Sequence, residues 1–129
     1  MRRSILIASA ALALASCGSS DPTAPTVSLT GTYTLQTING QLLPVQLTNG
    51  SVIVNDQLSL NGDGSYADVV QYAAAQGGTT SQTEYGTYSN NNGAIVFNDQ
   101  TDNITYQGSL SGSVLTVIVS GLTEAYKKN

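Results

Sequence analysis

Residues 51–75 read SVIVNDQLSLNGDGSYADVVQYAAA, and this stretch decides the fold class. Its centre, Asn61-Gly62-Asp63-Gly64, contains residues that accept the positive φ angles of a tight hairpin turn. On either side of this turn, apolar side chains recur at every second position, as at Val52 and Val54 before it and at Val70 and Tyr72 after it. Alternation with a period of two buries one face of a strand and leaves the other face in water. The stretch therefore predicts two antiparallel strands, 51–60 and 65–75.

The same pattern continues from residue 28 to residue 129, with short alternating runs separated by Gly and Asn. No run there has the period of an amphipathic helix. The predicted strands are 29–38, 41–47, 51–60, 65–75, 80–89, 94–98, 102–110, 113–119 and 122–127. Pro44 lacks a backbone donor, so we expect 41–47 to lie at an edge or in a loop. The run 114–119, VLTVIV, barely alternates, which indicates a strand covered on both faces.

The fold class follows from the number and length of these strands. A chain of 129 residues has room for one small domain. About eight short strands joined by hairpins can close into an up-and-down barrel, which leaves no unpaired strand edge. The sequence therefore predicts an all-β, single antiparallel eight-stranded up-and-down barrel over residues 28–129. A sandwich of two sheets is the alternative.

The first residues of the chain have the features of an export signal. MRRS at 1–4 is positively charged, and the apolar run 5–15 is too short for a bilayer core that needs about 20 helical residues. Leu14-Ala15-Ser16-Cys17 resembles the lipobox of bacterial lipoproteins. The resemblance implies a signal peptide at 1–16, cleavage before Cys17, and acylation of Cys17. Residues 17–27 then form a lipidated N-terminus and a flexible tether.

The lipobox resemblance also implies a location in the cell envelope. The residue after Cys17 is Gly18 rather than Asp, which favours an outer-membrane protein that faces the periplasm. The pair Arg2-Arg3 fits an ordinary secretory signal and also partly matches a twin-arginine signal, so both export routes stay open. A plain secreted protein with Cys17 beside the cleavage site is the alternative to a lipoprotein.

Composition argues against enzymes and nucleic-acid binding. The chain has no His and one Cys, which removes the usual catalytic base and most metal ligands, so we expect no catalytic residue, metal or cofactor. The nearest carboxylate pairs in the sequence are Asp63 with Asp68 and Asp99 with Asp102. Asp63 and Asp99 fall in predicted turns, where Asp bonds the backbone. Removal of 1–16 changes the charge from −4 to 2 − 8 = −6, which disfavours binding to nucleic-acid phosphates.

Several short motifs are similar to those of the small lipocalin-like lipoproteins of bacteria. They are Gly31-Thr32-Tyr33-Thr34-Leu35, Ile38 to Pro44, Leu58 to Tyr66, Gly86-Thr87-Tyr88 and Gly112 to Thr116. The resemblance covers residues 29–127 and implies a meander barrel that binds a ligand. This sequence departs from true lipocalins at two points. Tyr33 stands where they have a Trp, and no Arg follows Arg3 to pack on it.

Two functional hypotheses follow from this barrel. In the first, a non-catalytic binding module holds a small apolar or amphipathic ligand against inward-facing side chains. The residues predicted to line that site are Tyr33, Val70, Tyr72, Phe97 and Tyr106. In the second, side chains fill the barrel, and its polar outer face meets a protein of the envelope, so the chain is a structural or interaction module.

Overall fold

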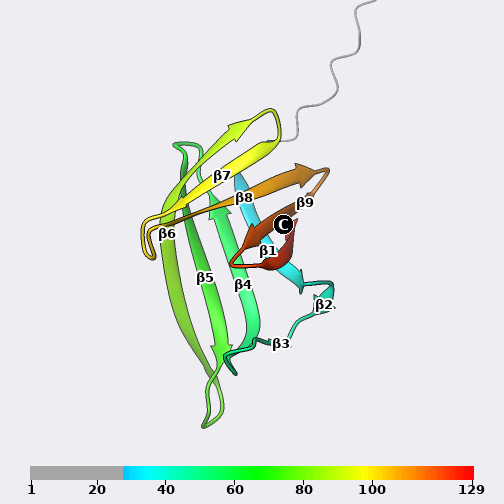
Figure 1. The fold of residues 1–129 in the computed structure, drawn as a ribbon, viewed down its shortest axis with the longest axis vertical. Helices are drawn as coiled ribbons and strands as arrows, with labels where there is room; N and C mark the ends of the chain where they lie inside the picture. Colours follow the sequence, from blue (N-terminus) through cyan, green and yellow to red (C-terminus); the bar gives the residue numbers. More distant parts are fainter. Residues whose placement is uncertain (1–27) are drawn as a thin grey trace, which may run out of the picture.

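The computed structural model describes residues 28–129, which form ten strands and no helix (Figure 1). The strands are β1 (Gly31–Ile38), β2 (Gln41–Leu42), β3 (Val45–Gln46), β4 (Val52–Leu60), β5 (Ser65–Ala73), β6 (Thr79–Asn91), β7 (Ala94–Asp99), β8 (Ile104–Ser111), β9 (Val114–Val119) and β10 (Leu122–Lys128). Within this range there is accordingly no apolar helix of membrane-spanning length. The predicted signal peptide at 1–16 and the tether with Cys17 lie outside the described residues.

The long strands form a closed antiparallel barrel. From β4 to β10, each strand pairs with the next one in the chain, and β1 pairs with both β10 and β4. Gly31 lies opposite Leu60 in the β1–β4 pair, and Tyr33 lies opposite Lys128 in the β1–β10 pair. This closure confirms the eight-stranded up-and-down barrel and excludes the sandwich. Because the barrel closes on itself, we expect residues 28–129 to fold as an independent domain.

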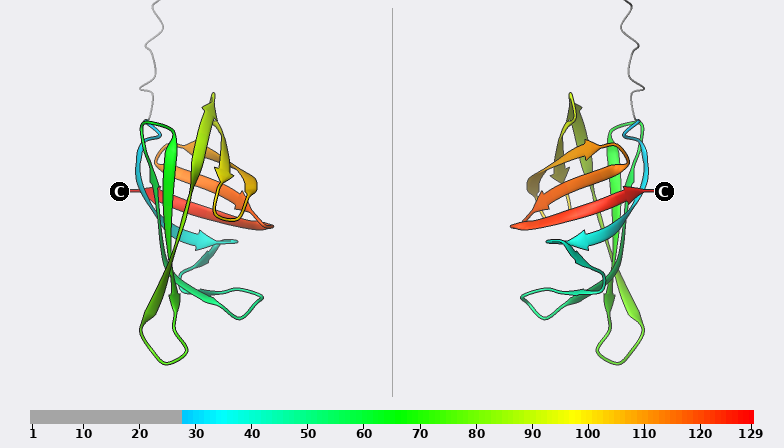
Figure 2. Two further views of the ribbon diagram at one scale, coloured as in Figure 1. Left: turned by 90° about the vertical axis from the view of Figure 1, so that its left-hand side faces the viewer. Right: turned by 90° about the vertical axis from the view of Figure 1, so that its right-hand side faces the viewer.

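The strands on opposite sides of the barrel cross at a steep angle. Figure 2 shows β4, β5 and β6 running along the long axis of the molecule, while β9 and β10 run across it. The short strands β2 and β3 come from the predicted segment 41–47 and occupy the two ends of the sheet order, as the position of Pro44 predicted. The hairpin of β5 and β6 extends beyond the rest of the barrel (Figure 1).

The predicted turns lie where glycine and asparagine placed them. Asn39-Gly40, Asn92-Gly93 and Ser120-Gly121 have positive φ at both positions, which matches the right-handed twist of the strands that they join. Asp63 Oδ1 accepts hydrogen bonds from the Ser65 backbone N–H at 2.9 Å and from its hydroxyl at 2.6 Å. Asp99 Oδ1 likewise accepts the backbone N–H groups of the turn after β7. Both aspartates therefore stabilise turns.

One half of the barrel is filled by aromatic rings. Phe97 stacks on Tyr106 with ring centroids 4.9 Å apart, and Tyr66 meets Phe97 edge-on at 5.5 Å. The strands leave room for these rings at two glycines. A Cβ at Gly86 would lie 2.6 Å from the Tyr66 ring, and one at Gly108 would lie 3.1 Å from Phe97. Glycine at these positions therefore lets the rings lie directly against the strand backbone.

Two details of burial differ from the sequence prediction. Strand β9 is not covered on both faces, because Ile118 is 57 % exposed and only its inward neighbours Leu115 and Val117 are buried. In β4, the alternation of Val52 and Val54 suggested that they face the core, but an irregularity between Ile53 and Asn55 shifts the register, and Ile53 is the buried residue. Both strands therefore lie where they were predicted, but the exposure of β9 and the register of β4 differ from the prediction.

Candidate functional site

The other half of the barrel contains a cavity of about 210 Å³. Exposed residues at its edge, Asp102 and Ser120, show that it opens to solvent. Most of its wall is apolar and comes from β4, β5, β8, β9, β10 and the segment after β3. The apolar lining residues are Leu47, Ile53, Leu58, Val70, Ile104, Val117, Val119 and Leu122.

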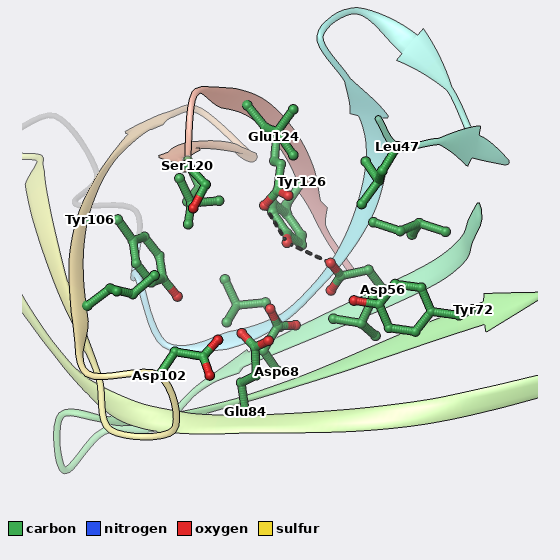
Figure 3. A pocket seen from close by; sticks show the side chains of 17 residues that line it. Leu47, Asp56, Asp68, Tyr72, Glu84, Asp102, Tyr106, Ser120, Glu124 and Tyr126 are labelled. Carbon is green, nitrogen blue, oxygen red and sulfur yellow. Dashed lines mark hydrogen bonds between the residues drawn. The ribbon is translucent and has the colours of Figure 1, made fainter. Parts of the chain in front are cut away.

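Four carboxyl groups project into this cavity from four strands: Asp56 on β4, Asp68 on β5, Glu84 on β6 and Glu124 on β10. Figure 3 shows Asp68 and Glu84 side by side, Asp56 and Glu124 on either side of the Tyr126 hydroxyl, and Asp102 at the edge. Asp56 is 2 %, Asp68 7 % and Glu124 9 % exposed. These groups concentrate much of the acidity of the barrel in one cavity.

Hydrogen bonds satisfy only part of this cluster. The Tyr126 hydroxyl lies 2.9 Å from Asp56 Oδ2 and 3.1 Å from Glu124 Oε2, so its one proton can be donated to either carboxylate. Asp56 Oδ1 and Asp68 Oδ1 are buried and accept no hydrogen bond from an N–H or hydroxyl group; a bond between the two carboxyls requires a proton on Asp68. Buried polar atoms normally have a partner, so these two oxygens need an explanation.

No cation of the described chain balances these acids. Its basic side chains are Lys127 and Lys128, and neither lines the cavity. Lys128 Nζ instead donates to the carbonyl of Ser28 and lies 5.7 Å from the centre of the Tyr33 ring. Among residues 28–129, no three acidic, His or Cys side chains converge closely enough to hold a metal ion.

Burial makes the cavity carboxyls weak acids. Loss of water, together with the neighbouring Asp56, raises the pKa of Asp68 to about 9. Burial also raises the pKa of Asp56 to about 6, although hydrogen bonds from protonated Asp68 and from Tyr126 oppose the rise. Burial and the surrounding acids raise the pKa of both Glu84 and Glu124 to about 7. The cluster therefore holds protons that free carboxyls lose near pH 4.

The structure brings together three of the five residues predicted to line a ligand site. Val70, Tyr72 and Tyr106 line the cavity. Tyr33 and Phe97 do not, because both are fully buried in the other half of the barrel. The Tyr33 hydroxyl donates to the Leu29 carbonyl at 2.6 Å, so the ring closes that half.

The sequence analysis missed the carboxyl cluster. It paired Asp63 with Asp68 and Asp99 with Asp102 because these acids are close in sequence. In the structure, Asp68 instead faces Asp56 and Glu84, which come from the neighbouring strands. A signal was present, because Asp68 has the same parity as Val70 and Tyr72 and so shares their inward face.

Comparisons with known proteins bear on the fold alone. No protein-family model matches the chain, and no curated protein matches it. Among solved structures, it resembles a lipocalin-like protein from Bacteroides uniformis. That structure is 18 % identical and superimposes with a TM-score of 0.49, over 78 % of this chain and 98 % of the other.

Proposed function

We propose that this protein is a lipid-anchored binding module of the bacterial cell envelope, and that its barrel holds a small amphipathic ligand without catalysis. The observation that carries the proposal is a cavity of about 210 Å³ whose wall is mostly apolar and whose buried carboxyl oxygens lack partners. Ligand sites in proteins combine an apolar wall with a few placed polar groups. A barrel filled by side chains would leave no such space.

The chemistry of the wall supports binding rather than catalysis. No cysteine or lysine lines the cavity, and the one serine in its lining, Ser120, lies at the edge. The chain has no His that could act as a base. Nucleophilic catalysis needs a nucleophile that touches its activating base.

The anchor is proposed from the lipobox at Cys17. The eleven residues 17–27 can span at most roughly 40 Å, at about 3.5 Å for each extended residue. The barrel would therefore stay close to the membrane surface, where amphipathic molecules concentrate. Gly18 favours the outer membrane, with the barrel in the periplasm.

Native mass spectrometry tests the binding proposal. Residues 28–129 are purified from the envelope of an expressing bacterium and sprayed under native conditions, and bound molecules are then identified after solvent extraction. We expect one small molecule per barrel. A barrel that is stable, empty and silent on titration with envelope extracts would contradict the proposal and favour the structural or interaction module.

Cell fractionation tests the anchor. Cys17→Ser removes the thiol that accepts the lipid, so the variant should leave the membrane fraction and behave as a water-soluble protein. Ser19→Ala, two residues further along the predicted tether, is the matched control and should stay in the membrane fraction. A Cys17→Ser protein that remains with the membranes would rule out anchoring through this residue.

A further inference from the structure

We propose that the cavity selects a small organic cation, namely a primary amine that carries a short apolar group. This inference rests on the proposed function, since it names the ligand class for the same cavity. It starts from an imbalance in the barrel. Four carboxyl side chains face one space, and no basic side chain of the described residues faces it.

The unpartnered oxygens indicate what is missing from this space. Asp56 Oδ1 and Asp68 Oδ1 are buried at the cavity wall and accept no hydrogen bond from an N–H or hydroxyl group of the described residues. The proton that Asp68 retains is the one donor between these two carboxyls. An ionised carboxylate can only accept, so a partner that replaces this proton must itself be a donor. An ammonium group offers three N–H donors and a positive charge, and charge-assisted hydrogen bonds are about twice as strong as neutral ones. An ammonium group in this space can therefore supply the donor that an ionised Asp56 or Asp68 needs.

The arrangement of the acids favours an organic cation over a metal ion. Metal ions need several oxygens converging at a single short distance, and no group of three acids within 28–129 meets that requirement. The carboxyls instead lie around a wider space whose remaining wall is apolar, including Val70, Val117 and Leu122. An aliphatic or aromatic group attached to the ammonium would cover that wall.

The size of the cavity limits the ligand. A cavity of about 150 Å³ is enough for benzene. At about 210 Å³, this cavity has room for an amine of roughly ten non-hydrogen atoms. Phenethylamine and hexylamine are therefore suitable probes, and 2-phenylethanol and hexan-1-ol match them in size without the charge.

Binding of an amine should also depend on pH. The titratable groups that face the cluster come from β5, β7, β8, β10 and the turn after β7, whereas β9 supplies none. They are Tyr66, Tyr72, Asp99, Tyr106, Tyr126 and Asp102. The tyrosines stay neutral between pH 5 and pH 8, because burial raises the pKa of each. Asp56, Glu84 and Glu124 ionise across this range, so the cavity gains negative charge while the amine stays protonated. Affinity for the amine should rise with pH, and affinity for the alcohol should not.

Titration calorimetry on residues 28–129 tests the proposal. At pH 8 we expect each amine to bind at least about tenfold more tightly than its alcohol. Between pH 5 and pH 8, amine affinity should rise at least about tenfold, with protons released on binding. Alcohols that bind as tightly as the amines would overturn the proposed amine selectivity but leave the binding function intact. If neither the amines nor the alcohols bind, and no small molecule co-purifies with the barrel, both the amine selectivity and the binding function are overturned.

Variants identify the groups responsible. Asp56→Asn removes a buried charge but keeps an oxygen that accepts from Tyr126, and it should weaken amine binding at least about tenfold while leaving alcohol binding unchanged. Glu84→Gln should act in the same direction if Asp56→Asn folds poorly. Asp63→Asn makes the same charge change in the exposed β4–β5 turn and should bind the amines normally. Equal losses in Asp63→Asn and Asp56→Asn would show that net charge, not the cavity, attracts the amine.

Discussion

Replacing Glu124 with glutamine should stabilise the protein above neutral pH. Glu124 is 9 % exposed, and burial, together with the charges of Asp68 and Glu84, raises its pKa from 4.5 to about 7. The native state thus holds this proton more tightly than the unfolded chain. The free energy of unfolding therefore falls as pH rises from about 4.5 to about 7, and the full penalty is present at pH 8.

The size of the effect follows from the same two values. At about 1.4 kcal/mol for each pKa unit, the rise from 4.5 to about 7 corresponds to about 3 kcal/mol. The glutamine side chain is neutral at every pH, and its oxygen can still accept from Tyr126, whose hydroxyl lies 3.1 Å from the present carboxylate oxygen. We therefore expect Glu124→Gln to raise the free energy of unfolding by about 3 kcal/mol at pH 8 and by less than about 1 kcal/mol at pH 5.

Urea unfolding of residues 28–129, followed by circular dichroism at pH 5 and pH 8, measures both values. Asp63→Asn is the control, because the pKa of Asp63 is lowered by its bonds to Ser65 and its charge is favourable in the native state. It should give no stabilisation at pH 8. A Glu124→Gln protein that is destabilised at pH 8, or equally stabilised at both pH values, would refute the reasoning.

The aromatic half of the barrel supports two further predictions, both measured by the same unfolding experiment. Gly86→Ala places a Cβ 2.2 Å from the Asn98 carbonyl oxygen and 2.6 Å from the Tyr66 ring, and it should cost about 3 kcal/mol or more; a neutral result would mean that both the neighbouring strand and the ring can shift. Tyr33→Phe should cost about 1 kcal/mol through the lost bond to the Leu29 carbonyl, whereas Tyr33→Ala should cost about 3 to 5 kcal/mol. A loss below about 1 kcal/mol for Tyr33→Ala would place its ring at the surface.

The fold was predictable because its determinants are local. Alternation along 65–75 fixed the inward face of that strand, and pairs such as Asn92-Gly93 fixed the hairpins. In a chain of hairpins with no helix to cover the sheet edges, pairing of the first and last strands into a barrel removes the exposed edges. The pairing of β1 with β4 is not adjacent in the chain and was inferred from this general argument rather than from particular residues.

The site was only partly predictable because it depends on contacts between distant strands. Asp56 and Tyr126 meet across 70 residues of sequence, and their contact depends on the register of several strand pairs. Irregularities in β1 and β4 shift that register locally, as the burial of Ile53 shows. Tyr33 and Phe97 were correctly predicted to face inward. Their positions in the alternating pattern give the face of the strand but not the half of the barrel that the two rings fill.

Carbon NMR titration of the side-chain carboxyl groups in residues 28–129 tests the central claim most directly, namely that one half of the barrel is a water-poor acidic cavity. The account predicts that Asp68 titrates last, near pH 9, with Glu84 and Glu124 near pH 7 and Asp56 near pH 6. Asp63 should titrate below 3.8 in the same spectra. If all four cavity carboxyls instead titrate below about pH 5, like free carboxyls, they are as well hydrated as exposed groups and the account is wrong.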